Sequence, residues 1–98
     1  PFIPEYATNN GHMFYLVCTS IDQRTSLIDH LKNDGIHSVF HYLSLHKSPY
    51  YRDKYDGREL VYSDRFTDQL VRLPMFYELT NSDVERIIDS VKTFFKSL

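Results

Sequence analysis

The chain has 98 residues, a formal net charge of −2 and a hydrophobic content of 42%, values typical of one small globular domain over residues 1–98. Basic residues are scattered among acidic ones, so the charge pattern gives no indication of a footprint for nucleic acid or an anionic membrane. The lone Cys18 excludes an internal disulfide, and no apolar run is long enough to cross a bilayer. These features predict a cytoplasmic protein with neither nucleic acid nor membrane as partner. The first residue is Pro1 rather than Met, which is compatible with a piece of a longer protein but does not establish one.

The first two elements are predicted from apolar spacing. Residues 12–19 are apolar in both alternating sets, which predicts a strand covered on both faces and therefore central in its sheet. A helix follows within residues 21–36, because Leu27 and Leu31 lie at helical spacing and Gly35 stands where a C-cap glycine belongs. On this helix we expect His30 to be a solvated surface residue without a chemical partner.

The next segment is predicted to be a short strand followed by a long loop. Residues 36–42 alternate, with one face formed by Ile36, Ser38, Phe40 and Tyr42 and the other by His37, Val39 and His41. Residues 44–62 are polar, aromatic and rich in turn formers, which is typical of a long functional loop.

The last three elements alternate between helix and strand. Ser63 is a plausible N-cap for a helix that runs to Leu70. Residues 72–76 can form only an edge strand or one that ends at Pro74. Residues 81–96 carry an apolar stripe behind a capping-box start, which predicts a helix. The sequence therefore predicts the α+β class, as a two-layer sandwich of an about three-stranded sheet with helices on one face.

The stretch VFHYLSLHKSPYY at 39–51 contains the candidate chemistry. In a strand, His37 and His41 lie about 13 Å apart, too far to share a metal ion, so no metal site is predicted. His41, Tyr42 and His46 stand where a strand meets a loop, and their side chains can hydrogen-bond sugar hydroxyls or phosphate oxygens. The alternative, in which Tyr42 packs in the core and His41 caps a backbone carbonyl, remains open.

Four motifs, in order, carry a family resemblance: HMFYL, LIDHLK..GI, HY..LH..P.Y and RLP.FY.LT. Over residues 11–96 the chain resembles the C-terminal domain of the DegT/DnrJ/EryC1/StrS sugar-nucleotide aminotransferases, which have the fold type I of aspartate aminotransferase. Within that family it is most similar to the dTDP-4-amino-4,6-dideoxygalactose transaminases.

The resemblance implies a pyridoxal 5'-phosphate (PLP) enzyme that works as a homodimer. Glutamate would donate the amino group, and the acceptor would be a nucleotide-linked 4-keto-6-deoxy sugar such as dTDP-4-keto-6-deoxyglucose, in lipopolysaccharide or enterobacterial common antigen biosynthesis. The lysine that binds the cofactor belongs to an N-terminal domain outside this sequence. We therefore expect no catalytic residue, no cofactor-binding residue and no bound cofactor in this chain, and no activity of the chain by itself.

The resemblance also implies roles for the residues of the stretch at 39–51. His41 and Tyr42 would contact the sugar or pyrophosphate of the substrate, with His46 nearby. Tyr51 would either pack the loop or touch the substrate. Ser44 stands where the family usually has proline, which is expected to add conformational freedom before His46.

Two alternatives to this interpretation remain open. One is a free-standing α+β ligand-binding or regulatory module with its own ligand at the loop. The other is an independent small enzyme, which the lack of a visible nucleophile–base pair disfavours.

Overall fold

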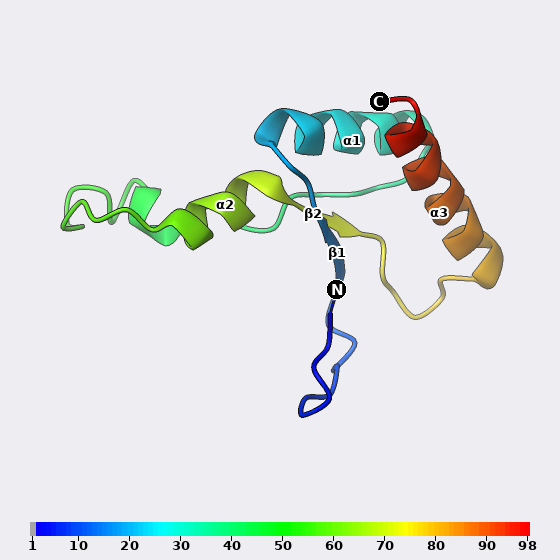
Figure 1. The fold of residues 1–98 in the computed structure, drawn as a ribbon, viewed down its shortest axis with the longest axis horizontal. Helices are drawn as coiled ribbons and strands as arrows, with labels where there is room; N and C mark the ends of the chain where they lie inside the picture. Colours follow the sequence, from blue (N-terminus) through cyan, green and yellow to red (C-terminus); the bar gives the residue numbers. More distant parts are fainter. Residues whose placement is uncertain (1) are drawn as a thin grey trace.

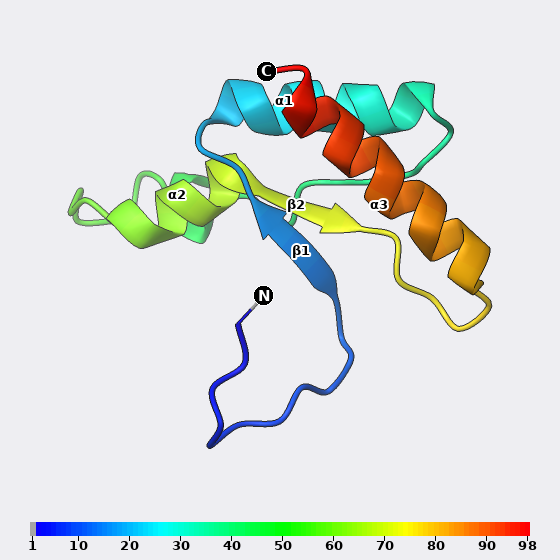
Figure 2. The same cartoon turned by 45° about the vertical axis from the view of Figure 1, so that its right-hand side comes forward.

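The computed structural model describes residues 2–98 and confirms the predicted α+β class. Its elements in chain order are β1 (Phe14–Val17), α1 (Ile21–Asn33), a short 3₁₀ helix (Leu45–Lys47), α2 (Val61–Gln69), β2 (Leu70–Leu73) and α3 (Asn81–Lys96). Figures 1 and 2 show α1 and α3 crossing on one side of the two strands. None of the helices in the described part of the chain is long and apolar enough to cross a membrane.

The sheet has two strands, not the expected three. Strand β1 pairs antiparallel with β2, from Phe14 opposite Leu73 to Val17 opposite Leu70. The predicted strand at 36–42 is reduced to one bridge, between Val39 and Arg72. The Val39 N–H donates to Arg72 O at 3.2 Å, and the Arg72 N–H donates to Val39 O at 2.7 Å. The middle position therefore belongs to β2, and the prediction that 12–19 forms the central strand is wrong.

The helices α1 and α3 cover one face of the sheet, and the other face is covered only in part, at Leu70. The core joins the inward residues of the strands to α1 and α3, and comprises Cys18, Leu27, Leu31, Ile36, Val71, Ile87 and Phe94. Because directly opposed residues point to the same side, Tyr15 and Arg72 lie on the other face. Val17 on that face is 37% exposed, so the expectation of a strand covered on both faces is also wrong. We call this side, which α1 and α3 leave uncovered, the open face.

The ends of the helices follow local sequence signals closely. Helix α1 starts at the N-cap Ser20 and ends in a Schellman motif, where Ile36 N–H bonds to Leu31 O at 2.8 Å and Gly35 has φ +72°. Helix α3 has the predicted capping box between Thr80 and Asp83. The Thr80 hydrogen bonds lower the pKa of the Asp83 carboxyl.

The start of α2 differs from its prediction, whereas the end of β2 agrees with it. Helix α2 begins at Val61, two residues before the expected N-cap, and ends at Gln69. Ser63 lies inside its first turn, where its hydroxyl donates to Ser44 Oγ at 3.4 Å instead of capping the helix. Strand β2 ends immediately before Pro74, as predicted.

His30 is a structural residue rather than a solvated one. Its Nε2 lies 3.1 Å from the Ser90 carbonyl oxygen and 3.5 Å from Asp34 Oδ2. Its ring is 5.5 Å from the ring of Phe94. The prediction that His30 lacks a partner is therefore wrong, because the crossing of α1 with α3 brings Ser90 and Phe94 to it.

The molecule is more extended than a compact domain of the same length. Its radius of gyration is 15.8 Å, whereas a compact domain of this length has about 13 Å. Figure 2 shows the reason, since the segment before β1 and the loop before α2 both project from the sheet and helices. The core therefore lies under α1 and α3, and the two projecting segments add little to it.

We predict that Gly35→Ala destabilises the fold by roughly 1 kcal/mol or more, because φ +72° strains an L side chain and an added Cβ would lie 3.2 Å from Arg86 Nη2. The matched control is Gly57→Ala, where φ is +82° but nothing lies within 4 Å. Urea unfolding would measure both, and a Gly35 variant no less stable than the Gly57 variant would contradict the prediction.

Candidate functional site

The predicted site residues lie on the segment that leaves the sheet after Val39 and returns along α2. His41 and Tyr42 line a cavity of about 230 Å³ against Phe66 and Thr67 of α2. His46 lines a different cavity of about 440 Å³, formed with the loop at 52–59. The structure therefore places the three residues on one segment but divides them between two cavities.

The rings of His41 and Tyr42 lie in contact at a tilted angle, and His41 has an unpaired polar atom. Their ring centroids are 4.4 Å apart at an interplanar angle of 55°. Tyr42 is 72% exposed, so the alternative in which it packs in the core is wrong. His41 Nδ1 is buried and has no hydrogen-bond partner within residues 2–98, so His41 does not cap a carbonyl through that atom. A buried polar atom without a partner is uncommon, and it marks His41 for a ligand or a water.

His46 is held by Asp64 of α2. Its Nε2 lies 3.1 Å from Asp64 Oδ1, and its ring is 5.2 Å from the ring of Tyr55. Lys47 Nζ contacts the same Asp64 oxygen at 2.9 Å. The hydrogen bond from Lys47 is the largest cause that lowers the pKa of the Asp64 carboxyl, and the charges of Lys47 and His46 act in the same direction. Asp64 thus anchors the 3₁₀ helix to α2.

Ser44, which stands where the family resemblance implies a proline, is held by contacts with α2. Its φ is −60°, the value that proline would fix. Its buried hydroxyl lies 2.6 Å from Thr67 Oγ1, and its single proton has two further acceptors within reach, Ser63 O at 3.3 Å and Asp64 Oδ1 at 3.4 Å. The side chain therefore fastens the segment to α2 by hydrogen bonds where proline would restrict the backbone.

Sequence reasoning did not find Asp64 or Thr67 as parts of the site. The two residues are three apart on α2 and so lie on one helical face. That spacing was visible in the sequence, but nothing there indicated that Ser44 and His46 would meet this face.

The cavity at His46 has mixed charge. Each of its three cations has an acidic neighbour: Lys47 contacts Asp64 at 2.9 Å, Arg52 contacts Asp53 at 3.8 Å and Arg58 contacts Asp56 at 2.8 Å. Such a cavity suits a ligand with several hydroxyl groups and a modest charge better than a polyanion. Tyr51 lines neither cavity and packs edge-on against Tyr50, with ring centroids 4.8 Å apart.

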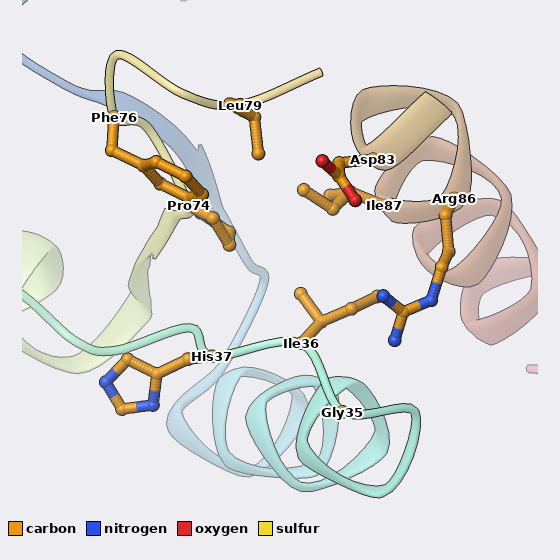
Figure 3. Close-up of a pocket in the computed structure, with 9 residues that line it drawn as sticks. All are labelled: Gly35, Ile36, His37, Pro74, Phe76, Leu79, Asp83, Arg86 and Ile87. Carbon is orange, nitrogen blue, oxygen red and sulfur yellow. The ribbon is translucent and has the colours of Figure 1, made fainter. Parts of the chain in front are cut away.

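A further cavity, of about 260 Å³, lies between the end of α1 and the start of α3. Figure 3 shows Arg86 reaching toward Gly35, with His37 pointing away from it. The Arg86 guanidinium donates to Asp34 O at the end of α1. This cavity therefore offers no unengaged arginine, and we assign it a structural role.

The side chains that could bond to a cofactor covalently are the lysines and Cys18. The lysines, Lys32, Lys47, Lys54, Lys92 and Lys96, are all exposed. Lys47 bonds to Asp64, and Lys54 Nζ lies 3.4 Å from the centroid of the Tyr50 ring. Burial raises the pKa of the Cys18 thiol, so it stays protonated. Within residues 2–98 no group of three or more His, Cys, Asp or Glu side chains could hold a metal ion.

The chain matches a family model over residues 2–92, that of the DegT/DnrJ/EryC1/StrS aminotransferase family. Several solved structures share the fold. The aminotransferase TlmJ from Streptoalloteichus hindustanus is 23% identical over 99% of this chain and 25% of its own, with a TM-score of 0.86. Helicobacter pylori PseC, an aminotransferase of pseudoaminic acid biosynthesis, is 20% identical over 89% of this chain and 24% of its own, with a TM-score of 0.78.

A third similar structure bears on the cofactor. Spr1654 from Streptococcus pneumoniae, a proposed sugar aminotransferase in its PMP form, is 24% identical over 88% of this chain and 22% of its own, with a TM-score of 0.73. The chain therefore spans about a quarter of the length of these proteins. At these identities the likeness shows the fold, and the family rests on the model match.

We predict that Lys47→Met raises the pKa of Asp64 toward its ordinary value of 3.8, because it removes the largest cause of the lowering. A lowered folded pKa means that the anchor is complete above the ordinary value and is lost as the pH falls through the lowered one. Carboxyl ¹³C titration would measure the shift. Lys54→Met is the control, since Lys54 packs on Tyr50, and an unchanged Asp64 pKa in Lys47→Met would contradict the assignment.

Proposed function

Because the chain belongs to the DegT/DnrJ/EryC1/StrS aminotransferase family, we propose that it is the C-terminal domain of a longer, PLP-dependent aminotransferase. In this proposal the enzyme transfers an amino group from glutamate to a nucleotide-linked 4-keto-6-deoxy sugar. The span of about a quarter of its structural relatives supports the view that a larger part of the protein lies elsewhere. The domain would contribute to the substrate cleft and would be inactive alone.

The observation that carries the substrate role is the buried, unpaired Nδ1 of His41 beside the exposed Tyr42. Leaving a buried polar atom without a partner costs free energy, so a ligand group that bonds to it is favoured. Imidazole and phenol together offer both donor and acceptor atoms, the combination that sugar hydroxyls need. We assign these two side chains to the sugar or the adjacent phosphate oxygens of the nucleotide sugar.

His46 has a secondary role in this proposal. Its Nε2 is engaged by Asp64 at 3.1 Å, so that atom is occupied in this conformation. The 440 Å³ cavity beside it lies in the range of small-molecule sites. We propose that His46 shapes this cavity for the more distant part of the substrate, and that Tyr51 packs the loop.

In this proposal the cofactor is held by residues outside this chain. Bound PLP supplies the electron sink for amino-group transfer, and the lysine that holds it would belong to the remaining part of the protein. The finer assignments are a dTDP-linked sugar that yields the 4-amino-4,6-dideoxygalactose product, a homodimeric enzyme, and a role in lipopolysaccharide or enterobacterial common antigen biosynthesis. They are all part of the proposal. The competing function is a free-standing ligand-binding or regulatory module, which an intact gene that encodes only this domain would favour.

We predict that Tyr42→Phe and His41→Ala in the full-length protein each raise the KM for the nucleotide sugar by about tenfold, the effect of one lost hydrogen bond. The cofactor absorbance and the KM for the amino donor should stay unchanged. Steady-state kinetics with each substrate varied in turn would separate the two KM values.

The matched control is Tyr62→Phe, since Tyr62 is also exposed, at 74%, but lies on α2 away from the His41 cavity. Unchanged kinetics in both site variants would reject the assignment of His41 and Tyr42 to the substrate. Loss of the cofactor absorbance with the fold intact would place them at the cofactor instead.

A further inference from the structure

Arg24, near the start of α1, contacts the chain on both sides of the candidate site. Its side chain is half-buried. The guanidinium carbon lies 5.5 Å from the centroid of the Phe40 ring, and Nη1 donates to Thr67 O at 3.3 Å. Figures 1 and 2 both show the start of α1 beside the end of α2, the helix that carries Thr67. One side chain of α1 therefore reaches both the residue before His41 and the helix against which His41 packs.

The contact with Thr67 supports the C-terminal end of α2. Helix α2 ends at Gln69, so the Thr67 carbonyl belongs to its last turn, where carbonyl groups lack a partner farther along the helix. A cation at this end also suits the negative pole of the helix dipole. The Thr67 hydroxyl in turn lies 2.6 Å from Ser44 Oγ. Through Thr67, Arg24 therefore supports the residue that fastens the chain after Tyr42 to α2.

The contact with Phe40 restrains the chain before His41. Within the part of the chain that the structure describes, residues 40–43 form no hydrogen bond to another backbone group. Phe40 is also 42% exposed, so burial alone does not fix its position. A guanidinium within about 6 Å of a ring centroid is attracted to the face of the ring. The position of residues 40–43 therefore depends on side-chain contacts at their two ends, and Arg24 contributes to both.

The position of Arg24 also carries a cost. Within residues 2–98 its Nε is buried without a hydrogen-bond partner, and its side chain forms no ion pair. A buried donor that stays unpaired costs free energy. Departures from such packing rules occur mainly at functional sites, where another requirement offsets the cost. This arrangement indicates that Arg24 serves the neighbouring site and not stability alone.

We propose that Arg24 is a positioning residue for His41 and Tyr42, an inference that rests on the proposed function of this pair as contacts of the nucleotide sugar. Arg24 does not line the cavity of the pair. It restrains the chain directly on the side before the pair, and through α2 on the side after it. Binding groups that are held in place before the ligand arrives bind it at a lower entropic cost.

The first test is steady-state kinetics of the full-length enzyme. Arg24→Met should raise the KM for the nucleotide sugar by about fivefold, less than the tenfold expected when a direct contact is lost. The KM for glutamate and the cofactor absorbance should stay unchanged. Arg24→Lys keeps a cation near Phe40 but loses the planar guanidinium, so its KM should lie between those of Arg24→Met and the wild type.

The matched control is Arg86→Met. Arg86 also donates to a carbonyl at the end of a helix, that of Asp34, but this helix is α1 and not α2. Arg86→Met should leave the KM for the nucleotide sugar unchanged, even where thermal melting shows that it destabilises the fold as much as Arg24→Met. An equal rise of this KM in both variants would assign Arg24 a general structural role and overturn the proposal.

The second test needs no substrate and so separates the positioning role from the proposed function. Diethyl pyrocarbonate modifies neutral imidazole rings, and peptide mass spectrometry gives the rate at each histidine of the full-length protein. In Arg24→Met the half-buried His41 should react about fivefold faster, because the chain around it opens more often. The rate at the exposed His12 should stay unchanged.

The two tests together give distinct outcomes. A faster reaction of His41 with an unchanged KM for the nucleotide sugar, or in a protein that transfers no amino group, would keep the positioning role and reject the proposed function of the pair. An unchanged rate at His41 in Arg24→Met would overturn the positioning role, whatever the KM. If Arg24→Met does not fold, Arg24→Lys decides, and the wild-type rate at His41 in that variant would overturn it.

Discussion

The two-sided pairing of β2 is the interaction on which the rest of this structure depends. Its four residues pair with β1 along one edge, and on the other edge Arg72 forms a bridge with Val39. Adjacent residues of a strand point to opposite faces, so Val71 is fully buried under the helices while Arg72 emerges on the open face. Helix α2 ends at Gln69 and β2 begins at Leu70. The position of the strand therefore also fixes where α2 ends.

The position of α2 in turn determines the geometry of the candidate site. One face of this helix presents Asp64 and Thr67 to the segment that carries Ser44 and His46. These contacts link residues about twenty apart in the chain, and they hold a region with little regular structure against a regular helix. Groups held on a regular element keep their positions better than groups on a free loop. The separation of His41 from His46 into two cavities follows from the same arrangement, because Ser44 lies between them and is tied to α2.

The parts of the fold that the sequence predicted well are those controlled by neighbours along the chain. The stop of α1 at Gly35 and the capping box at Thr80 need only a few adjacent residues, and both are present as expected. The order of the strands was predicted wrongly because pairing is a long-range choice: Arg72 meets Tyr15 across 57 positions and Val39 across 33. The site shows the same division. His41 and Tyr42 could be named from their local setting, whereas Asp64 acquires its role only through the fold.

The uncovered side of the sheet gives a physical reason for where the polar functional groups lie. Helices α1 and α3 seal one face with apolar side chains, and an unpaired arginine or histidine placed in that layer would carry a desolvation cost with no partner to offset it. The alternation of the strands sends such groups to the other face, where a ligand or another part of a longer protein can reach them. The backbone of Arg72 is held by hydrogen bonds within the sheet. Its charged side chain lies on the face opposite the apolar core. A sheet covered on both faces, as the apolar pattern of residues 12–19 suggested, would have left no surface on which such a group could act.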